Sequence, residues 1–421
     1  RDLPCPLRRQ RQMCIRDRVM IGESYDSIKN FIDDVKPDWV LVSILFSNLV
    51  VHGKKIAEIV KSIDPKIKTI LGGNHVNNTY TEVLNDRFVD YVVLGECDFS
   101  VGELISSVLE GKDIGKIKGV AFKYDNKIIS NGLSTRINDL NTLPREARDL
   151  MNMEGYFDVG LFHSAKSRSK RVGNIMATRG CPEKCSFCTT PQMWGNTVRW
   201  RDPENIFAEI RDIVTDYGIE EIQFDDDTLT ANIKKLLMLC DLIEPLDIKW
   251  CTPNGVKINY HSKNPTKQDN LYKRMFESGC YQITFGVETG NQDILDNTIN
   301  KRLPLDTVKQ AIESAKRAGM LVHTFWMVGF PGETFEQMEH TIKFAESIES
   351  DSYSVAITTP LPGTKLFNEV AEKNLFIDGL SKEQIIERIH FSKGIIKVDG
   401  FDSNDEFEKW VNQANIYLNL V

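Results

Sequence analysis

The stretch Ala177-Thr-Arg-Gly-Cys-Pro-Glu-Lys-Cys-Ser-Phe-Cys188 decides the fold class of this chain of 421 residues. Its three cysteines are Cys181, Cys185 and Cys188, separated by three residues and then by two. Thiolates at this spacing can hold three irons of a cubane [4Fe–4S] cluster, whose four irons ordinarily take four protein ligands. The fourth iron would stay open to another ligand.

A structural zinc site is the alternative interpretation of these cysteines. Such a site takes four protein ligands, and the sequence offers no fourth one close by. The next cysteine is Cys240, and the nearest preceding histidine is His163. The spacing therefore favours the cluster.

The cysteine spacing, with the aromatic Phe187 before the last cysteine, resembles the radical S-adenosylmethionine (radical SAM) superfamily. The resemblance implies that the amino and carboxylate groups of SAM chelate the open iron, next to the electron donor that cleaves its sulfonium bond. A short motif is a hypothesis until its structural context agrees.

The residues after the cysteines show strand patterns that alternate with amphipathic helix patterns. This alternation predicts a βα series with a mostly parallel sheet. The expected strands lie at residues 174–178, 221–228, 281–290, 322–333 and 355–359, and the expected helices are Pro203–Tyr217 and residues 232–243, 268–278, 305–318 and 335–348. Carboxylates stand near the ends of two strands, where barrel-type folds place ligand contacts.

These stretches resemble the partial (β/α)6 TIM-type barrel of the radical SAM superfamily over about 200 residues. The resemblance implies that Asp225 and Asp226 contact the methionine amino group and that Glu288 contacts the ribose. Residues 328–331 would pack beside adenine. The SAM contacts implied in this way are Phe187, Asp225, Asp226, Glu288, Val328 and Pro331.

Simpler structural roles remain open for these residues. An Asp run at a strand end is often only a cap for the next helix, and Thr228 or Thr230 could serve the same purpose. The Gly-Phe-Pro-Gly sequence at residues 329–332 can equally be a turn that needs no ligand.

A second α/β unit is predicted upstream of the cysteines. Buried strand patterns at residues 37–46 and 67–71 flank a helix pattern at 54–63, and a third strand pattern covers 89–94. In a doubly wound sheet the ligand lies at the carboxyl ends of the strands. Glycines there let the ligand and the backbone approach closely.

The sequence Ser-x-Leu at residues 43–45, followed after 26 residues by Gly-Gly, resembles the truncated Rossmann-like (flavodoxin-like) cobalamin-binding fold. Its position before the cysteine motif resembles the cobalamin-dependent radical SAM enzymes. The cobalamin contacts that the resemblance implies are Ser43, Leu45, Gly72, Gly73, His75, Gly95 and Glu96. No histidine lies in an Asp-x-His-x-x-Gly pattern, so His75 is expected to line the cobalamin tail and not to bind cobalt. A generic flavodoxin-like domain and a domain that has lost its cobalamin are the alternatives.

Residues 8–17 resemble the in-frame translation of a sequencing adapter, so we expect residues 1–18 to be an irregular cloning scar. The alternative is a native basic arm. We expect an N-terminally truncated cobalamin-binding domain at 19–130, with an uncovered sheet edge near residues 40–43. A connector at 131–171 follows, with a solvated loop at 164–171, then a radical SAM core at 172–370. A helical C-terminal segment at 371–421, also expected to be cut short, has helices at 381–390 and 404–418 and would cover the open side of the barrel.

The composition restricts the function class. The formal net charge is −8 and the isoelectric point is near 5.6, which argues against a nucleic-acid partner. No run of 18 apolar residues predicts a membrane span. Nine cysteines fit a reducing cytoplasm, with Cys97, Cys240, Cys251 and Cys280 expected as ordinary buried thiols.

The resemblance implies an enzyme that uses a [4Fe–4S] cluster, SAM and cobalamin to methylate an unactivated carbon of a small molecule. Its electron donor would be external, such as a flavodoxin or a ferredoxin. The cofactors would carry the chemistry, and the protein would supply orientation and exclude water. A radical cyclase or oxidoreductase without methyl transfer, and a non-catalytic cobalamin sensor or carrier, are the alternatives.

Overall fold

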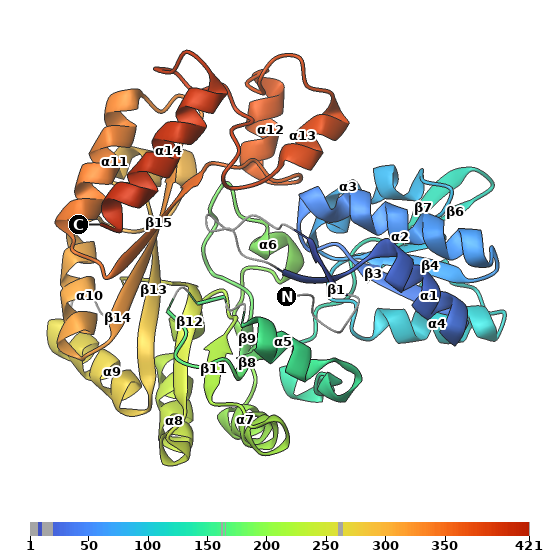
Figure 1. Cartoon of the computed structure of the whole chain (residues 1–421), viewed down its shortest axis with the longest axis horizontal. Helices are drawn as coiled ribbons and strands as arrows, with labels where there is room; N and C mark the ends of the chain where they lie inside the picture. The colour runs from blue at the N-terminus through green and yellow to red at the C-terminus, as the bar shows by residue number, and fades with distance from the viewer. Residues whose placement is uncertain (1–6, 11–19, 161–162, 165, 260–263, 421) are drawn as a thin grey trace.

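The computed structural model describes residues 7–10, 20–160, 163–164, 166–259 and 264–420. Figure 1 shows two α/β units side by side, with the C-terminal helices α12 and α13 reaching toward the first unit. None of the helices in these described ranges combines the length and the apolar character that a membrane crossing requires.

The first unit is a five-stranded sheet in the order β3-β4-β5-β6-β7. Its parallel strands β3 (Trp39–Ser43), β4 (Lys68–Gly72) and β5 (Tyr91–Val93) confirm the predicted parallel sheet. Its helices are α1 (Tyr25–Val35), α2 (Val50–Ile63), α3 (Asn74–Leu84) and α4 (Ser100–Leu109). The antiparallel hairpin of β6 (Val120–Tyr124) and β7 (Lys127–Ser130) was not predicted. Its turn residues Asp125 and Asn126 both have positive φ, as a two-residue hairpin turn requires.

The chain's first described strand, β1 (Leu7–Gln10), pairs antiparallel with β2 (Met20–Glu23) in a separate two-stranded sheet. The expectation of an irregular stretch is therefore wrong for residues 7–10. Residues 1–6 and 11–18 lie outside the described residues, and the scar interpretation stays a prediction.

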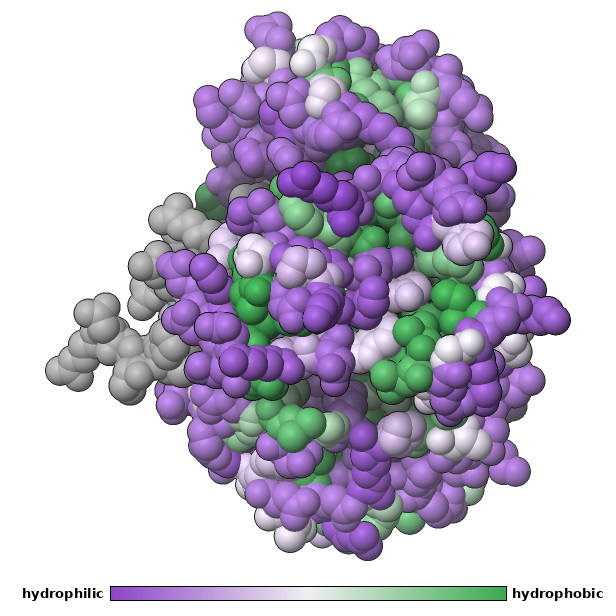
Figure 2. Space-filling view, turned by 90° about the vertical axis from the view of Figure 1, so that its right-hand side faces the viewer, coloured by the Kyte–Doolittle hydropathy of each residue, from purple (hydrophilic) through white to green (hydrophobic). Residues whose placement is uncertain are grey.

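Strand β3 pairs only with β4 among the described strands, which confirms the expected sheet edge. Several apolar side chains of this unit are exposed: Phe31, Val35, Leu41, Leu45 and Phe46. Figure 2 shows apolar patches between hydrophilic ones on the side of the molecule where this unit lies.

The second unit contains six parallel strands in the order β15-β14-β13-β12-β11-β8. They are β8 (Val172–Ile175), β11 (Glu221–Phe224), β12 (Lys249–Val256), β13 (Cys280–Glu288), β14 (Leu321–Val328) and β15 (Ser352–Ile357). The helices are α7 (Pro203–Tyr217), α8 (Ile233–Ile243), α9 (Pro265–Glu277), α10 (Asp306–Arg317) and α11 (Phe335–Ser347). They lie outside the curved sheet (Figure 1), and side chains from both layers form the largest hydrophobic core. The predicted βα series is confirmed.

Two details of this unit differ from the sequence prediction. The strand expected at residues 174–178 is interrupted: β8 ends at Ile175, and the separate strand β9 (Thr178–Arg179) pairs antiparallel with β10 (Arg199–Trp200). Strand β12 was not predicted, although Trp250 and Cys251 in it are buried. A buried strand with Pro253 and Gly255 in its second half lacks the regular alternation that reveals a strand.

The loop at residues 164–171 was expected to be solvated, and this holds only for part of it: Lys166, Arg168 and Lys170 are exposed, but the serines between them are not. Ser164 is buried, and its backbone N–H donates to the Gln223 side chain while its hydroxyl donates to the Gln282 side chain. The buried Glu221 carboxylate accepts hydrogen bonds from Ser167 and from the N–H of Arg168. The segment is therefore held against polar side chains of β11 and β13, and its serines pair with them because buried polar groups need partners.

The C-terminal segment contains α12 (Lys365–Glu372), α13 (Lys382–Arg388) and α14 (Asn404–Leu418). Helix α14 packs on β15, where the Asn415 amide bonds both backbone groups of Val355 and the Asn419 amide bonds both of Tyr353. These amides complete the edge of the sheet, which would otherwise present unpaired backbone groups.

Candidate functional site

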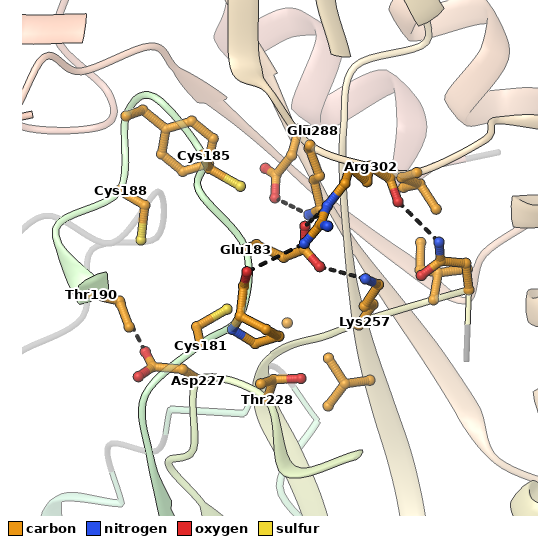
Figure 3. A pocket seen from close by; sticks show the side chains of 18 residues that line it. Cys181, Glu183, Cys185, Cys188, Thr190, Asp227, Thr228, Lys257, Glu288 and Arg302 are labelled. Atoms are coloured by element: carbon orange, nitrogen blue, oxygen red, sulfur yellow. Dashed lines mark hydrogen bonds and ion pairs between the residues drawn. The ribbon is translucent and has the colours of Figure 1, made fainter. Parts of the chain in front are cut away.

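The three predicted cluster cysteines lie on one loop and line one cavity. The loop runs from β9 to the short helix α6 (Thr190–Met193). Gly180 turns the chain into the loop with φ 102°, and a Cβ atom there would lie 2.4 Å from the carbonyl oxygen of Thr197. The cavity has a volume of about 140 Å³, and Figure 3 shows the sulfurs of Cys181, Cys185 and Cys188 around it.

The cysteine sulfurs surround this space and do not converge on one point (Figure 3). Among the described residues, no three His, Cys, Asp or Glu side chains meet closely enough to hold a single metal ion. Burial raises the pKa of Cys181 to about 11 and that of Cys185 to about 12, and it also raises the pKa of Cys188. The thiols are therefore neutral at neutral pH, and binding iron must displace their protons.

The three successive aspartates after β11, Asp225 to Asp227, lie in three different environments. Asp226 is buried, and its carboxylate accepts hydrogen bonds from the backbone N–H groups of Ala177 and Thr178. Burial raises the pKa of Asp226 to about 7, against the opposing effect of these bonds. Asp226 thus holds the segment that leads into the cysteine loop and does not line the cavity.

The neighbouring carboxylates point elsewhere. Asp225 accepts a hydrogen bond from the Asn174 amide at 2.8 Å and lies 3.2 Å from His163, also outside the cavity lining. Asp227 does line the cavity, and it accepts a hydrogen bond from the Thr190 hydroxyl at 3.0 Å (Figure 3). The sequence run contained Asp227, but the prediction selected its two neighbours.

The helix-cap alternative for this run is wrong. Helix α8 is capped by Asn232, whose side chain accepts from the N–H of Lys235. The Thr228 hydroxyl is instead buried in the cavity lining and has no hydrogen-bond partner among the described residues. An unsatisfied buried hydroxyl here leaves a polar contact open to a bound group.

Glu288 lines the cavity as expected, with an unpredicted partner. Its carboxylate forms an ion pair with Lys301 at 2.7 Å, and Lys301 also donates to the carbonyl of Gly286. Burial alone would lower the pKa of Lys301, but the charge and hydrogen bond of Glu288 act together with the charges of Cys185 and Cys181 to hold that pKa above its ordinary value. Lys301 follows a π-helical turn, η6 (Ile294–Ile299), a rare geometry often found at functional sites. No sequence pattern predicted that Lys301 would be part of the site.

The expected adenine contacts are only partly brought together at the cavity. Phe187 lines it, whereas Val328 is fully buried in the barrel core and Pro331 is outside the lining. Between them, Phe330 belongs to a buried apolar cluster against which Cys185 and Phe187 pack. The turn itself is closed by Glu333, which accepts from the N–H groups of residues 329 and 330. Turn chemistry therefore accounts for much of this motif.

The predicted cobalamin residues gather at the carboxyl edge of the first sheet. Ser43 and Gly72 are direct neighbours in the β3–β4 pairing, and both Ser43 and Leu45 are exposed. Gly73 has φ 98°, and a Cβ atom there would lie 2.6 Å from the carbonyl oxygen of Ile44. Gly73 thus already serves a close backbone approach to Ile44, and Gly72 makes room for the Val93 side chain of β5.

The other three predicted cobalamin residues are occupied by protein contacts. His75 is buried, and its Nδ1 atom lies 2.9 Å from the Ser47 hydroxyl in η1 (Ser47–Leu49). Gly95 donates its N–H to the side chain of Asn77. The Glu96 carboxylate forms ion pairs with arginines of the second unit and is fully buried.

The two units meet beside the cysteine loop. From α3, Asn74 donates to the Thr189 hydroxyl, Asn77 to the sulfur of Met193 and Asn78 to the side chain of Gln192. These contacts place the carboxyl edge of the first sheet against the segment that follows Cys188. The sites predicted for the two cofactors therefore lie on facing edges.

Comparisons with known proteins agree with this arrangement. A family model described as the radical SAM superfamily matches residues 175–345, and one described as the B12 binding domain matches residues 14–104. An uncharacterized methyltransferase of Pyrococcus horikoshii is 30% identical over 376 residues, which cover 88% of this chain and 77% of that protein. The chain belongs to the radical SAM superfamily and carries a B12-binding domain.

Two further likenesses are informative for this radical SAM protein. The cytidylyl-2-hydroxyethylphosphonate methyltransferase of Streptomyces wedmorensis is 27% identical over 94% of the chain and 77% of its own length. The radical SAM methyltransferase TsrM of Kitasatospora setae, solved with cobalamin and a [4Fe–4S] cluster, superposes with a TM-score of 0.69. That likeness covers 93% of this chain and 80% of TsrM at 14% identity, so it shows the shared fold.

The other four described cysteines lie away from the cavity lining, which gives a testable expectation. Replacing Cys97, Cys240, Cys251 or Cys280 singly with alanine should leave the iron content of the reconstituted radical SAM protein unchanged. Iron assays on anaerobically reconstituted variants check this. Loss of iron in any of the four would indicate a second cluster.

The buried histidines predict a pH dependence of stability. Burial lowers the pKa of His75 and of His323 from 6.5 to about 4. The unfolded chain then binds more protons than the folded one between these values, so stability is lost as the pH falls from about 6.5 to about 4. We expect a smaller loss in His75→Gln, whose amide can still bond Ser47 but does not titrate. Urea unfolding measured across this pH range tests the prediction. An equal loss of stability in His75→Gln and in the unsubstituted chain would contradict it.

Proposed function

We propose that this chain is a cobalamin-dependent radical SAM methyltransferase that acts on an unactivated carbon of a small molecule. One observation carries the proposal: the carboxyl edge of the B12-binding sheet lies directly against the segment that follows the three cysteines. Methyl transfer between two cofactors requires such adjacency, because the reacting atoms must come within a few ångströms of one another.

The donor set fits the proposed cluster. We propose that Cys181, Cys185 and Cys188 hold a [4Fe–4S] cluster, because their sulfurs line one cavity and no fourth protein thiol is at hand among the described residues. The remaining lining offers Asp227 and Glu288 for the amino and hydroxyl groups of SAM. Lys301, beside Glu288, supplies the positive charge that suits a carboxylate.

When bound, the cluster supplies an electron for SAM cleavage and the cobalamin supplies the methyl group; the chain orients both and excludes water. Cys185 and Phe187 pack against the buried apolar cluster that contains Phe330, which keeps this side of the cavity apolar. Ser43, Leu45, Gly72 and Gly73 remain our proposed contacts for cobalamin. We also propose an external flavodoxin or ferredoxin as electron donor and a reducing, cytoplasmic setting, which the free thiols favour.

The experiment uses the chain reconstituted with iron, sulfide and hydroxocobalamin under a strong reductant. With SAM carrying a deuterated methyl group, we expect 5′-deoxyadenosine, S-adenosylhomocysteine and a label on the cobalamin fraction, detected by mass spectrometry. The label should then appear in a methylated product once substrates are screened. Formation of 5′-deoxyadenosine without any S-adenosylhomocysteine would contradict the methyltransferase proposal and favour a cyclase or oxidoreductase.

A further inference from the structure

Four charged side chains form a cluster where the B12-binding sheet meets the second unit. Glu96 forms an ion pair with Arg199 at 2.6 Å, and its Oε2 atom accepts hydrogen bonds from Arg199 at 2.9 Å and from Arg179 at 3.3 Å. Arg179 also donates to Asp98 at 2.8 Å. The side-chain exposures are 0% for Glu96, 10% and 13% for the arginines and 29% for Asp98. Water therefore screens the central carboxylate very little.

The sequence positions of these residues connect the two proposed cofactor sites. Glu96 and Asp98 lie on the loop after β5, at the carboxyl edge of the first sheet. Arg179 is the last residue of β9, two positions before Cys181, and its partner across the β9–β10 pairing is Arg199. The only strand that leads into the cysteine loop in the described chain is thus tied by charge to the B12-binding unit.

Additional contacts fix both arginines in place. Arg179 stacks over the ring of Trp194 at 4.6 Å, and Arg199 donates to the carbonyl groups of Trp194 and Ile137. Burial alone would raise the pKa of Asp98, but its bonds to Arg179 outweigh burial and hold that pKa below its ordinary value. These contacts leave the arginine heads little freedom to move.

We propose that Glu96 is a positioning residue that fixes the B12-binding edge against the cysteine loop, and so sets how efficiently the methyl group passes between the two cofactor sites. This inference rests on the proposed function. A buried carboxylate between two guanidinium groups holds them in a defined geometry, because each bond is charge-assisted and directional. Without that charge, the two arginines repel one another and the junction loosens.

The test substitution is Glu96→Gln, which keeps the size of the side chain and removes its charge. The chain offers a matched control, because Glu209 is also buried between two arginines, Arg148 at 2.8 Å and Arg201 at 2.6 Å. That cluster joins α7 to the connector and to the residue after β10, away from the B12-binding unit. Glu209→Gln therefore loses the same kind of interaction on the barrel side, where its arginines bond the carbonyl groups of Asn174 and Met176, and removes no contact to the B12-binding unit.

Two products report the two reactions of SAM in the reconstituted holoenzyme. 5′-Deoxyadenosine reports radical cleavage, and S-adenosylhomocysteine reports transfer of the methyl group to cobalamin. We expect Glu96→Gln to lower the ratio of S-adenosylhomocysteine to 5′-deoxyadenosine about fivefold or more, the lower end of typical coupling between sites. Glu209→Gln should leave the ratio unchanged, because a purely structural loss lowers both products together.

Electron paramagnetic resonance gives an independent readout. The signal of cob(II)alamin relaxes faster when a reduced cluster is nearby, and this enhancement should weaken in Glu96→Gln and persist in Glu209→Gln. If Glu96→Gln fails to fold, Asp98→Asn takes its place as the test variant. It should also lower the product ratio and weaken the relaxation enhancement. An unchanged ratio and unchanged relaxation in the folded variant would overturn the positioning role. Absence of S-adenosylhomocysteine from the unsubstituted enzyme would instead overturn the proposed function.

Discussion

Replacing Cys188 with alanine should abolish the cluster and lower SAM cleavage by a factor on the order of 100 or more, because a cubane held by three thiolates loses one of its three anchors. Cys188 is the last residue of the motif, and its thiol lies in the cavity beside Thr190 and Asp227. Iron should fall from about four atoms per chain to below about one. Iron analysis, the visible absorption spectrum and 5′-deoxyadenosine release measure the effect.

The control for this prediction is Cys240→Ala. Cys240 is fully buried in the barrel core, so its removal also deletes a buried thiol, but outside the cavity. This variant should keep its iron and its SAM cleavage. Stoichiometric zinc and no iron in the unsubstituted protein would show that the cluster interpretation is wrong.

The second large effect is expected from Asp226→Asn. The Asp226 carboxylate accepts one hydrogen bond from the N–H of Ala177 and one from the N–H of Thr178. The asparagine side chain has only one oxygen that can accept, so its NH₂ group would face the second N–H donor. A buried donor left without an acceptor costs about 1–3 kcal/mol of unfolding free energy. Since these groups belong to the segment that enters the cysteine loop, the variant should retain less than about half of its iron after reconstitution.

Asp225→Asn is the matched control, because it is the adjacent residue with the same chemistry. The Asp225 carboxylate is 31% exposed and bonds side chains outside the cavity, so iron retention and the urea midpoint should stay near those of the unsubstituted chain. Equal iron retention in both variants would show that Asp226 does not support the cysteine loop.

The sequence determined the features that depend on local pattern. The boundaries of α7 and α14 were predicted to the residue, because amphipathic periodicity marks a helix within a few turns of chain. The cysteine spacing placed Cys181, Cys185 and Cys188 on one loop, since eight residues cannot spread far. The parallel order of β3, β4 and β5 followed from strand and helix patterns in alternation.

Only the tertiary structure decided which side chains face the cavity. Three successive aspartates carry the same chemical signal, yet the turn after β11 sends Asp226 beneath the cysteine loop and Asp227 into the cavity. Lys301 reaches Glu288 through a π-helical turn, and Glu96 meets its arginines across more than eighty residues of chain. Such partners are chosen by packing between distant segments, because a buried charge is stable only where another element supplies its counter-charge. Pairing between such distant residues depends on the three-dimensional arrangement, so no periodic pattern in the sequence predicts it.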